Sequence, residues 1–196
     1  MGKLNRKIEQ KDSEKLENHE EKEKLFKMED FYKKHFKSSE EKVKKISLKD
    51  LQELKKVGIT TENFLDYLCQ KHRLLLHGSI HEISGDKLKS SKKIIFASNK
   101  AAIAIMKSLY SGENVNLEYR YFITEKKPLM LKVHIQPDGK LIKTSKGFVY
   151  VVNRVGFKNS PKGSWQFVKN VEEIEFNAVV ETEDRDFQYP VDFLKF

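Results

Sequence analysis

One segment constrains the fold more than any other: the run from Ala101 to Tyr110 is almost entirely apolar in a strongly polar chain. Charged residues make up 34% of the 196 positions, so the run stands out against its surroundings. A helix that is apolar on nearly every side must be buried on nearly every side. The sequence therefore predicts a domain packed around this helix, which Ser111 and Gly112 would terminate.

Two short capped helices are predicted ahead of the apolar run. Ser47 has the character of an N-cap, with Asp50 three residues later, and Gly58 closes that helix. Thr60 or Thr61 caps the next helix. The expected buried face of this second helix is Phe64, Leu65, Leu68 and Cys69.

Strand signals surround and follow the apolar helix. The expected strands are 74–76, 94–97, 117–123, 129–135, 140–143, 148–152, 165–168 and 174–180. The segment Gln136-Pro137-Asp138-Gly139 is predicted to be a turn, because Pro fixes φ and Gly supplies a positive φ. Helices followed by mostly antiparallel strands, with one buried helix among them, indicate an α+β fold.

Residues 1–45 differ from the rest, because Lys and Glu alternate there around a thin apolar stripe. We therefore divide the chain into a charged helical or partly disordered extension, 1–45, and a domain, 46–196. Two interpretations of the extension stay open. It is either a solvated arm or a helix that binds a partner through Phe31, Tyr32 and Phe36.

Composition excludes several classes of protein. A single cysteine, Cys69, excludes an internal disulfide and fits a reducing compartment. No apolar run approaches the roughly 20 residues that cross a bilayer, and the first residues lack the apolar core of a signal peptide. His72, His77 and His81 lack the Cys or carboxylate spacing of a metal site. We therefore expect a soluble, cytoplasmic protein without membrane contact or metal. Its net charge of +9 is compatible with polyanionic partners.

The strand at 74–76 ends in the triplet His77-Gly78-Ser79. A side chain there can leave the sheet edge into a cleft, and Gly lets the backbone approach a ligand closely. After a polar stretch comes a second strand, Ile94-Ile95-Phe96-Ala97-Ser98, and then the apolar helix. In this order the segments resemble the ADP-ribosyltransferase superfamily. Its poly(ADP-ribose) polymerases have a Leu-x-His-Gly-Ser strand, a loop, a Tyr-Phe-Ala strand and a helix.

A second resemblance is to small uncharacterised prokaryotic proteins of the same fold. Their pattern is a strand like residues 147–152, a Phe such as Phe157, a Trp such as Trp165, and a terminal strand. Together the two resemblances cover about residues 65–196. They imply a fold of split antiparallel sheets with a buried helix.

The resemblance implies NAD-dependent transfer of ADP-ribose to a macromolecular acceptor, either protein or nucleic acid. NAD would be both cofactor and substrate. By analogy, His77 would bond a ribose hydroxyl, the Gly78 backbone would hold the nicotinamide carboxamide, and Ser79 would lie beside it. Ile95 and Phe96 occupy the place of the family's Tyr, which packs against nicotinamide.

The family also requires a carboxylate, because departure of nicotinamide develops positive charge on the ribose. Three glutamates, Glu172, Glu173 and Glu175, lie at the start of a late strand. Glu173 best matches the family pattern, so the resemblance assigns catalysis to His77 and Glu173. Glu175 would face the same side by the period-two alternation of a strand.

Departures from the family pattern leave alternatives open. An aliphatic Ile95 replaces the stacking Tyr, and Ile103 and Met106 replace a Ser and a second Tyr of the helix. The domain is therefore either an active transferase or a catalytically degenerate module that binds a nucleotide or nucleic acid. A third alternative is an interaction protein whose extension does the binding. The lysines of the intervening loop, Lys87, Lys89, Lys92 and Lys93, either face a polyanion or are simply solvated.

Overall fold

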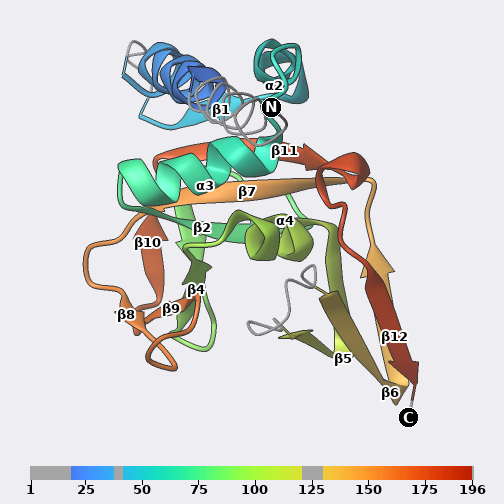
Figure 1. The fold of residues 1–196 in the computed structure, drawn as a ribbon. Helices are drawn as coiled ribbons and strands as arrows, with labels where there is room; N and C mark the ends of the chain where they lie inside the picture. The colour runs from blue at the N-terminus through green and yellow to red at the C-terminus, as the bar shows by residue number, and fades with distance from the viewer. Residues whose placement is uncertain (1–18, 38–41, 121–129, 196) are drawn as a thin grey trace, which may run out of the picture.

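The computed structural model describes residues 19–37, 42–120 and 130–195, and it confirms an α+β architecture (Figure 1). In this part of the chain, four α-helices accompany a mixed seven-stranded sheet and two small sheets of two and three strands. The same part of the chain contains no helix that is long and apolar enough to cross a membrane.

The helical elements are a helix over 19–32, a π-helical turn at Lys33–Lys37, α2 (Leu48–Lys55), α3 (Thr61–Lys71), α4 (Ala101–Leu109) and a 3-10 turn at Asp184–Asp186. The strands are β1 (Lys44–Ile46), β2 (Leu74–Ser79), β3 (Lys87–Lys89), β4 (Ile95–Ser98), β5 (Tyr110–Arg120), β6 (Met130–Lys143), β7 (Lys146–Asn153), β8 (Lys158–Asn159), β9 (Gln166–Lys169), β10 (Glu173–Glu175), β11 (Ala178–Glu183) and β12 (Val191–Lys195).

The two predicted helix caps are confirmed. The Ser47 hydroxyl accepts the amide of Asp50, whose carboxylate accepts the Ser47 amide in return. Thr60 and Asn63 form the same reciprocal pair at α3. Such a capping box satisfies amides that have no partner within the helix.

The main sheet has the strand order β1-β11-β7-β2-β4-β9-β8. β1 runs parallel to β11, and the other neighbours are antiparallel. β2 pairs with β7 along its whole length, but with β4 only at Leu76 and Ser98. The sheet is therefore held together weakly at this seam.

The core has two layers, one on each face of the main sheet. Leu74 and Leu76 of β2 point into the layer that contains the N-terminal helix, α2, α3 and α4. Leu75 points into the opposite layer with Tyr150 and Phe176. This alternation is the period of two expected for a strand that is covered on both faces.

α4 is buried, as its apolar sequence predicted, and it lies directly against the sheet. A Cβ added at Gly78 of β2 would lie 2.0 Å from the Ala104 carbonyl oxygen. At Gly147 of β7 the corresponding distance to the Ser108 oxygen is 1.9 Å. Two glycines therefore permit a helix-to-sheet approach that a side chain would prevent.

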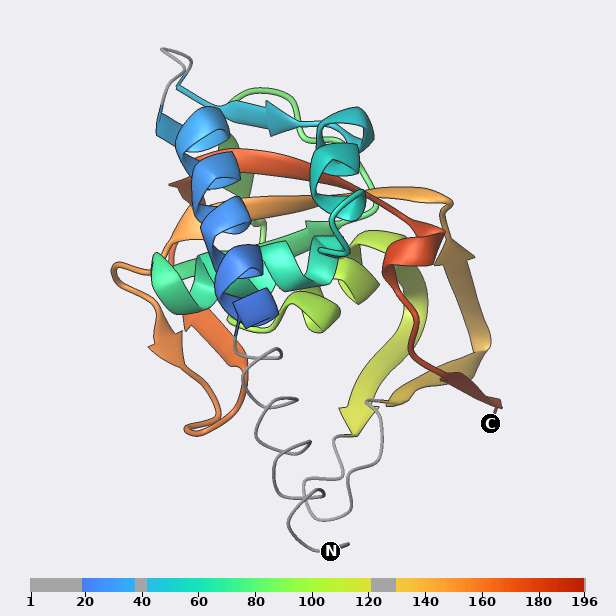
Figure 2. The same cartoon turned by 45° about the horizontal axis from the view of Figure 1, so that its top comes forward.

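The described part of the extension packs on the domain. Met28 and Phe31 are buried, and the ring of Tyr32 stacks on His72 with centroids 3.7 Å apart. Figure 2 shows this helix, in blue, crossing α3. The boundary we placed after residue 45 falls within β1, at one edge of the main sheet. Residues 1–18 and 38–41 lie outside the described residues.

The predicted turn at Gln136–Gly139 is wrong, because these residues belong to β6. Ile135 pairs with Val115 and Lys140 with Glu113, so four residues of β6 oppose a single residue of β5. A bulge tolerates a Pro, which has no amide to donate to the ladder. The chain also passes from α4 into β5 at Tyr110, so Ser111 and Gly112 continue a strand.

Candidate functional site

A cavity of about 470 Å³ lies at the seam where β2 and β4 share only one residue pair. We call it the notch. Its lining comes from β2, β4, β9 and α4: Leu76, His77, Gly78, Phe96, Ala97, Ser98, Ile103, Ala104, Lys107 and Gln166. Segments that are distant in sequence thus meet at one opening, as is typical of ligand sites.

The ring of His77 bridges the two strands. Its Nδ1 lies 2.7 Å from the carbonyl oxygen of Phe96. Because a carbonyl only accepts, Nδ1 carries the proton, and in the neutral ring Nε2 is then an acceptor. Burial lowers the pKa of His77; the Phe96 carbonyl opposes this effect, and the Lys107 ammonium adds to it. The neutral ring is therefore favoured at pH 7.

The other residues predicted around the cofactor separate into two groups. Gly78 and Phe96 line the notch, and the Phe96 side chain is 49% exposed. Ile95 is 2% exposed and packs in the core layer on the opposite face. Ser79 lies at the end of β2, where its hydroxyl donates to the His81 carbonyl and accepts the His81 amide.

Sequence reasoning missed three polar residues that line the notch: Ser98, Lys107 and Gln166. Lys107 carries the only charge in α4, which is otherwise built of apolar or small residues. Burial lowers the pKa of its ammonium. One charge in an apolar helix is a signal that the sequence did contain. No local sequence signal marks Gln166, because it reaches the notch only through the order of strands, which places β9 next to β4.

Each of the three candidate glutamates forms an ion pair with a lysine. Glu173 pairs with Lys87 across the two-stranded sheet of β3 and β10, and this lysine lowers the pKa of the Glu173 carboxyl. Glu172 lies 2.8 Å from Lys93, and Glu175 lies 3.0 Å from Lys42. Glu172 and Glu173 line a separate cavity with Lys89, Ser90, Ser91 and Lys93. The notch lining includes none of the three carboxylates.

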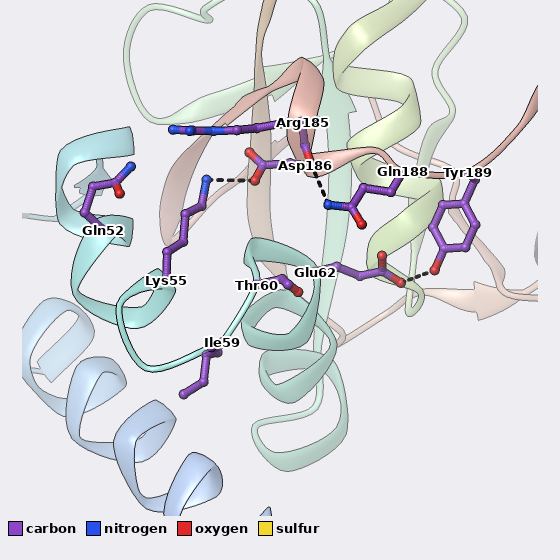
Figure 3. A pocket seen from close by; sticks show the side chains of 10 residues that line it. Gln52, Lys55, Ile59, Thr60, Glu62, Arg185, Asp186, Gln188 and Tyr189 are labelled. Atoms are coloured by element: carbon purple, nitrogen blue, oxygen red, sulfur yellow. Dashed lines mark hydrogen bonds and ion pairs between the residues drawn. The ribbon is translucent and has the colours of Figure 1, made fainter.

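A larger cavity, of about 550 Å³, lies between the α2–α3 connection and the segment that precedes β12 (Figure 3). Its charged groups contact one another. The Lys55 ammonium lies 2.9 Å from carboxylate oxygens of both Asp186 and Glu183, and Thr61 donates to Asp186 at 2.7 Å. We call this group of four residues the clamp.

Elsewhere in the described chain, the structure offers little for metal or thiol chemistry. Over residues 19–37, 42–120 and 130–195, no group of three His, Cys, Asp or Glu residues is placed to hold a metal ion. Burial raises the pKa of the Cys69 thiol to about 12. A thiol held in its protonated form is a poor nucleophile.

Comparisons with known proteins identify no relative. A scan against protein-family models, a search of curated proteins and a search of solved structures each return no match to this chain.

Proposed function

We propose that the notch binds NAD and that the chain is an ADP-ribosyltransferase-like protein that acts on a macromolecular acceptor. One observation carries the proposal: His77 and Gly78 of one strand and Phe96 of the next line a single cavity. These residues come from the two segments in which the sequence resembles the superfamily. The fold assignment to that superfamily is part of the same proposal.

The chemistry of the lining suits the nicotinamide–ribose end of NAD. The Nε2 of a neutral His77 can accept a hydrogen bond from a ribose hydroxyl. The half-exposed ring of Phe96 offers a face for an aromatic heterocycle. The volume falls within the range of about 300–1,000 Å³ that is typical of small-molecule sites. A pyrophosphate near Lys107 would favour the charged form of that ammonium.

In NAD a C–N bond joins the ribose to nicotinamide, and cleavage of this bond leaves positive charge on the ribose. The protein has to orient the sugar and stabilise that charge. His77 is suited to the first task. The carboxylate for the second would be Glu173, which is held by Lys87 in this structure and would have to be released from that pair.

The second candidate is a non-catalytic module of the same kind that binds a nucleotide in the notch. The ion pairs of Glu172, Glu173 and Glu175 favour it, because they engage every candidate carboxylate away from the notch lining. The buried, aliphatic Ile95 favours it too, since it replaces the stacking Tyr of the family.

Thermal unfolding with NAD or nicotinamide tests binding for both candidates. A ligand at one hundred times its Kd stabilises the native state by about 2.7 kcal/mol, so the midpoint should rise. His77→Ala should remove the rise. His81→Ala is the matched control, because His81 lies on the same stretch of chain but does not line the notch. If neither compound raises the midpoint, the proposal is wrong.

Labelled NAD with cell extract separates the two candidates. Transfer of label that is lost in Glu173→Gln supports the enzyme. A thermal shift without transfer supports the binding module. The Glu175→Gln variant controls for the loss of one surface carboxylate, because Glu175 lies on the same strand and also pairs with a lysine.

A further inference from the structure

The charge along the sequence is unevenly distributed. Residues 139–171 contain seven Lys or Arg and no Asp or Glu. This stretch includes β7, the β8–β9 hairpin and the turns between them. In Figure 1 the hairpin lies beside β4, at the far end of the main sheet from β1. Four of the seven, Arg154, Lys158, Lys162 and Lys169, lie in the β8–β9 hairpin or directly before it, and no acidic residue lies among them. The hairpin end of the sheet is therefore basic.

The cations of this end fall into two groups. Arg154 lies over the ring of Phe167, and Lys169 lies over the ring of Phe157. Lys158 on β8 and Lys162 in the hairpin turn are exposed. So is Lys92, two residues before Ile94. Within the described part of the chain, the ammonium groups of these three lysines make no hydrogen bond or ion pair. They are available to an anion in solution.

Exposed apolar side chains lie beside these lysines. Phe96 is directly opposite Val168 on β9, and Val168 is directly opposite Lys158 on β8. Residues opposite each other in antiparallel strands point to the same face, so these three share one side of the sheet. Ile94 is 37% exposed and Phe96 is 49% exposed. We call the set of Ile94, Phe96, Val168 and Lys158 the Phe96 face.

The Phe96 face continues the helical side of the sheet beyond α4. α4 packs on β2, β4, β7 and β11, whereas β9 and β8 come after β4 in the strand order. The notch opens at the junction, since Phe96 belongs to both. An extended ligand on this face would thus pass beside the notch.

We infer that the Phe96 face, with Lys92 and Lys162 at its margins, binds single-stranded nucleic acid. Phosphates would contact the three unpaired lysines, and an unpaired base would lie against the Phe96 ring. An aromatic platform flanked by cations is the arrangement that recognises single strands, because every base has a π-face and every nucleotide a negative charge. A duplex hides its bases and would gain only the charge contacts. Binding itself does not depend on NAD.

Fluorescence anisotropy with a labelled 12-nucleotide single strand, as RNA and as DNA without NAD, measures this binding. Three phosphate contacts give a slope of about −2 in log K against log salt, which is about a 16-fold loss between 50 and 200 mM. Lys158→Gln/Lys162→Gln should reduce the slope to about −0.7. Lys49→Gln/Lys56→Gln, two exposed lysines at α2, should keep the wild-type slope.

A strand of the same length with abasic sites tests the base contact without altering the protein. It should bind about tenfold more weakly, since one stacked base corresponds to a factor of about 5 to 140. The inference is overturned by absent or salt-independent binding, by equal losses in the two double variants, or by duplex or abasic strands that bind as tightly. A missing NAD shift alongside intact strand binding would instead remove only the proposed function.

Discussion

The notch is similar in size to the 550 Å³ cavity beside the clamp, which we call the clamp cavity, but the polar groups at the two places are used differently. Around the clamp, Lys55, Thr61, Glu183 and Asp186 contact one another at 2.7–2.9 Å. In the notch, the hydrogen bond between His77 and the Phe96 carbonyl uses one ring nitrogen and leaves the other as an acceptor. The polar groups of the clamp therefore satisfy one another, whereas the His77 ring keeps one acceptor that the Phe96 carbonyl does not use.

The difference has a topological cause. The clamp joins α2 and α3 to the 3-10 turn after β11, so it fixes this turn against the two helices. The notch exists because β2 and β4 share only one residue pair. A break in a sheet leaves backbone and side-chain groups facing a space instead of a neighbouring strand.

The largest effect is expected at the clamp. The Asp186 side chain is 3% exposed and accepts from Lys55, Thr61 and the Glu183 amide. Asp186→Ala should lower the free energy of unfolding by about 3 kcal/mol, because removing one partner of a buried pair leaves the others unsatisfied. Urea denaturation measures it. Glu53→Ala, in an exposed pair with Lys34, should change little; equal losses would contradict a structural clamp.

A smaller loss is expected at the floor of the notch. Gly78→Ala places a Cβ 2.0 Å from the Ala104 oxygen, which α4 cannot accommodate without moving. Overpacking of this kind costs about 1–3 kcal/mol. Urea denaturation should show that loss. Gly85→Ala is the contrast, because a Cβ at Gly85 meets no atom within 4 Å and its only cost is backbone strain from a φ of 87°. A Gly78→Ala protein of wild-type stability would show that α4 is not fixed to β2.

Much of the fold could be predicted because its signals are local. Ser47 with Asp50 is a capping pair readable from four residues, and the apolar composition of α4 predicted its burial. The turn at Gln136–Gly139 failed because Pro and Gly also fit a bulge, and only pairing with β5 distinguishes the two. The parallel pairing of β1 with β11 has no local signature either.

The candidate site was only half predictable for the same reason. His77, Gly78 and Phe96 lie near strand ends, where the sequence pattern draws attention to them. Gln166 joins them through the order of strands in the sheet, a long-range property. Ile95 was predicted beside the cofactor but lies in the core. Successive residues of a strand point to opposite faces, so Ile95 faces away from the side to which its neighbour Phe96 points.

The two cavities should also respond oppositely to pH. Burial lowers the pKa of His77 in the folded state, whereas in the unfolded chain the pKa has its ordinary value of about 6.5. At pH values just below about 6.5 the unfolded chain therefore binds more protons at this residue than the folded chain does. The contribution of His77 to stability is then complete above about pH 6.5 and is lost as the pH falls. One such proton contributes at most about 1.4 kcal/mol per pH unit. His35 and His72 act in the same direction, so His77→Gln should reduce the slope between pH 5 and 7 without abolishing it.

Glu62, which lines the clamp cavity and accepts the Tyr189 hydroxyl at 2.6 Å, has the reverse sign. Burial raises its pKa above the ordinary value, Tyr189 opposes this, and Asp66 reinforces it. The folded chain therefore binds the extra proton above about pH 4.5, and stability from this group is lost as the pH rises. Glu62→Gln should remove that loss while leaving the histidine-dependent gain intact, as measured by urea denaturation from pH 4.5 to 7.5. If His77→Gln and Glu62→Gln shifted the profile in the same direction, the contrast between the cavities would not hold.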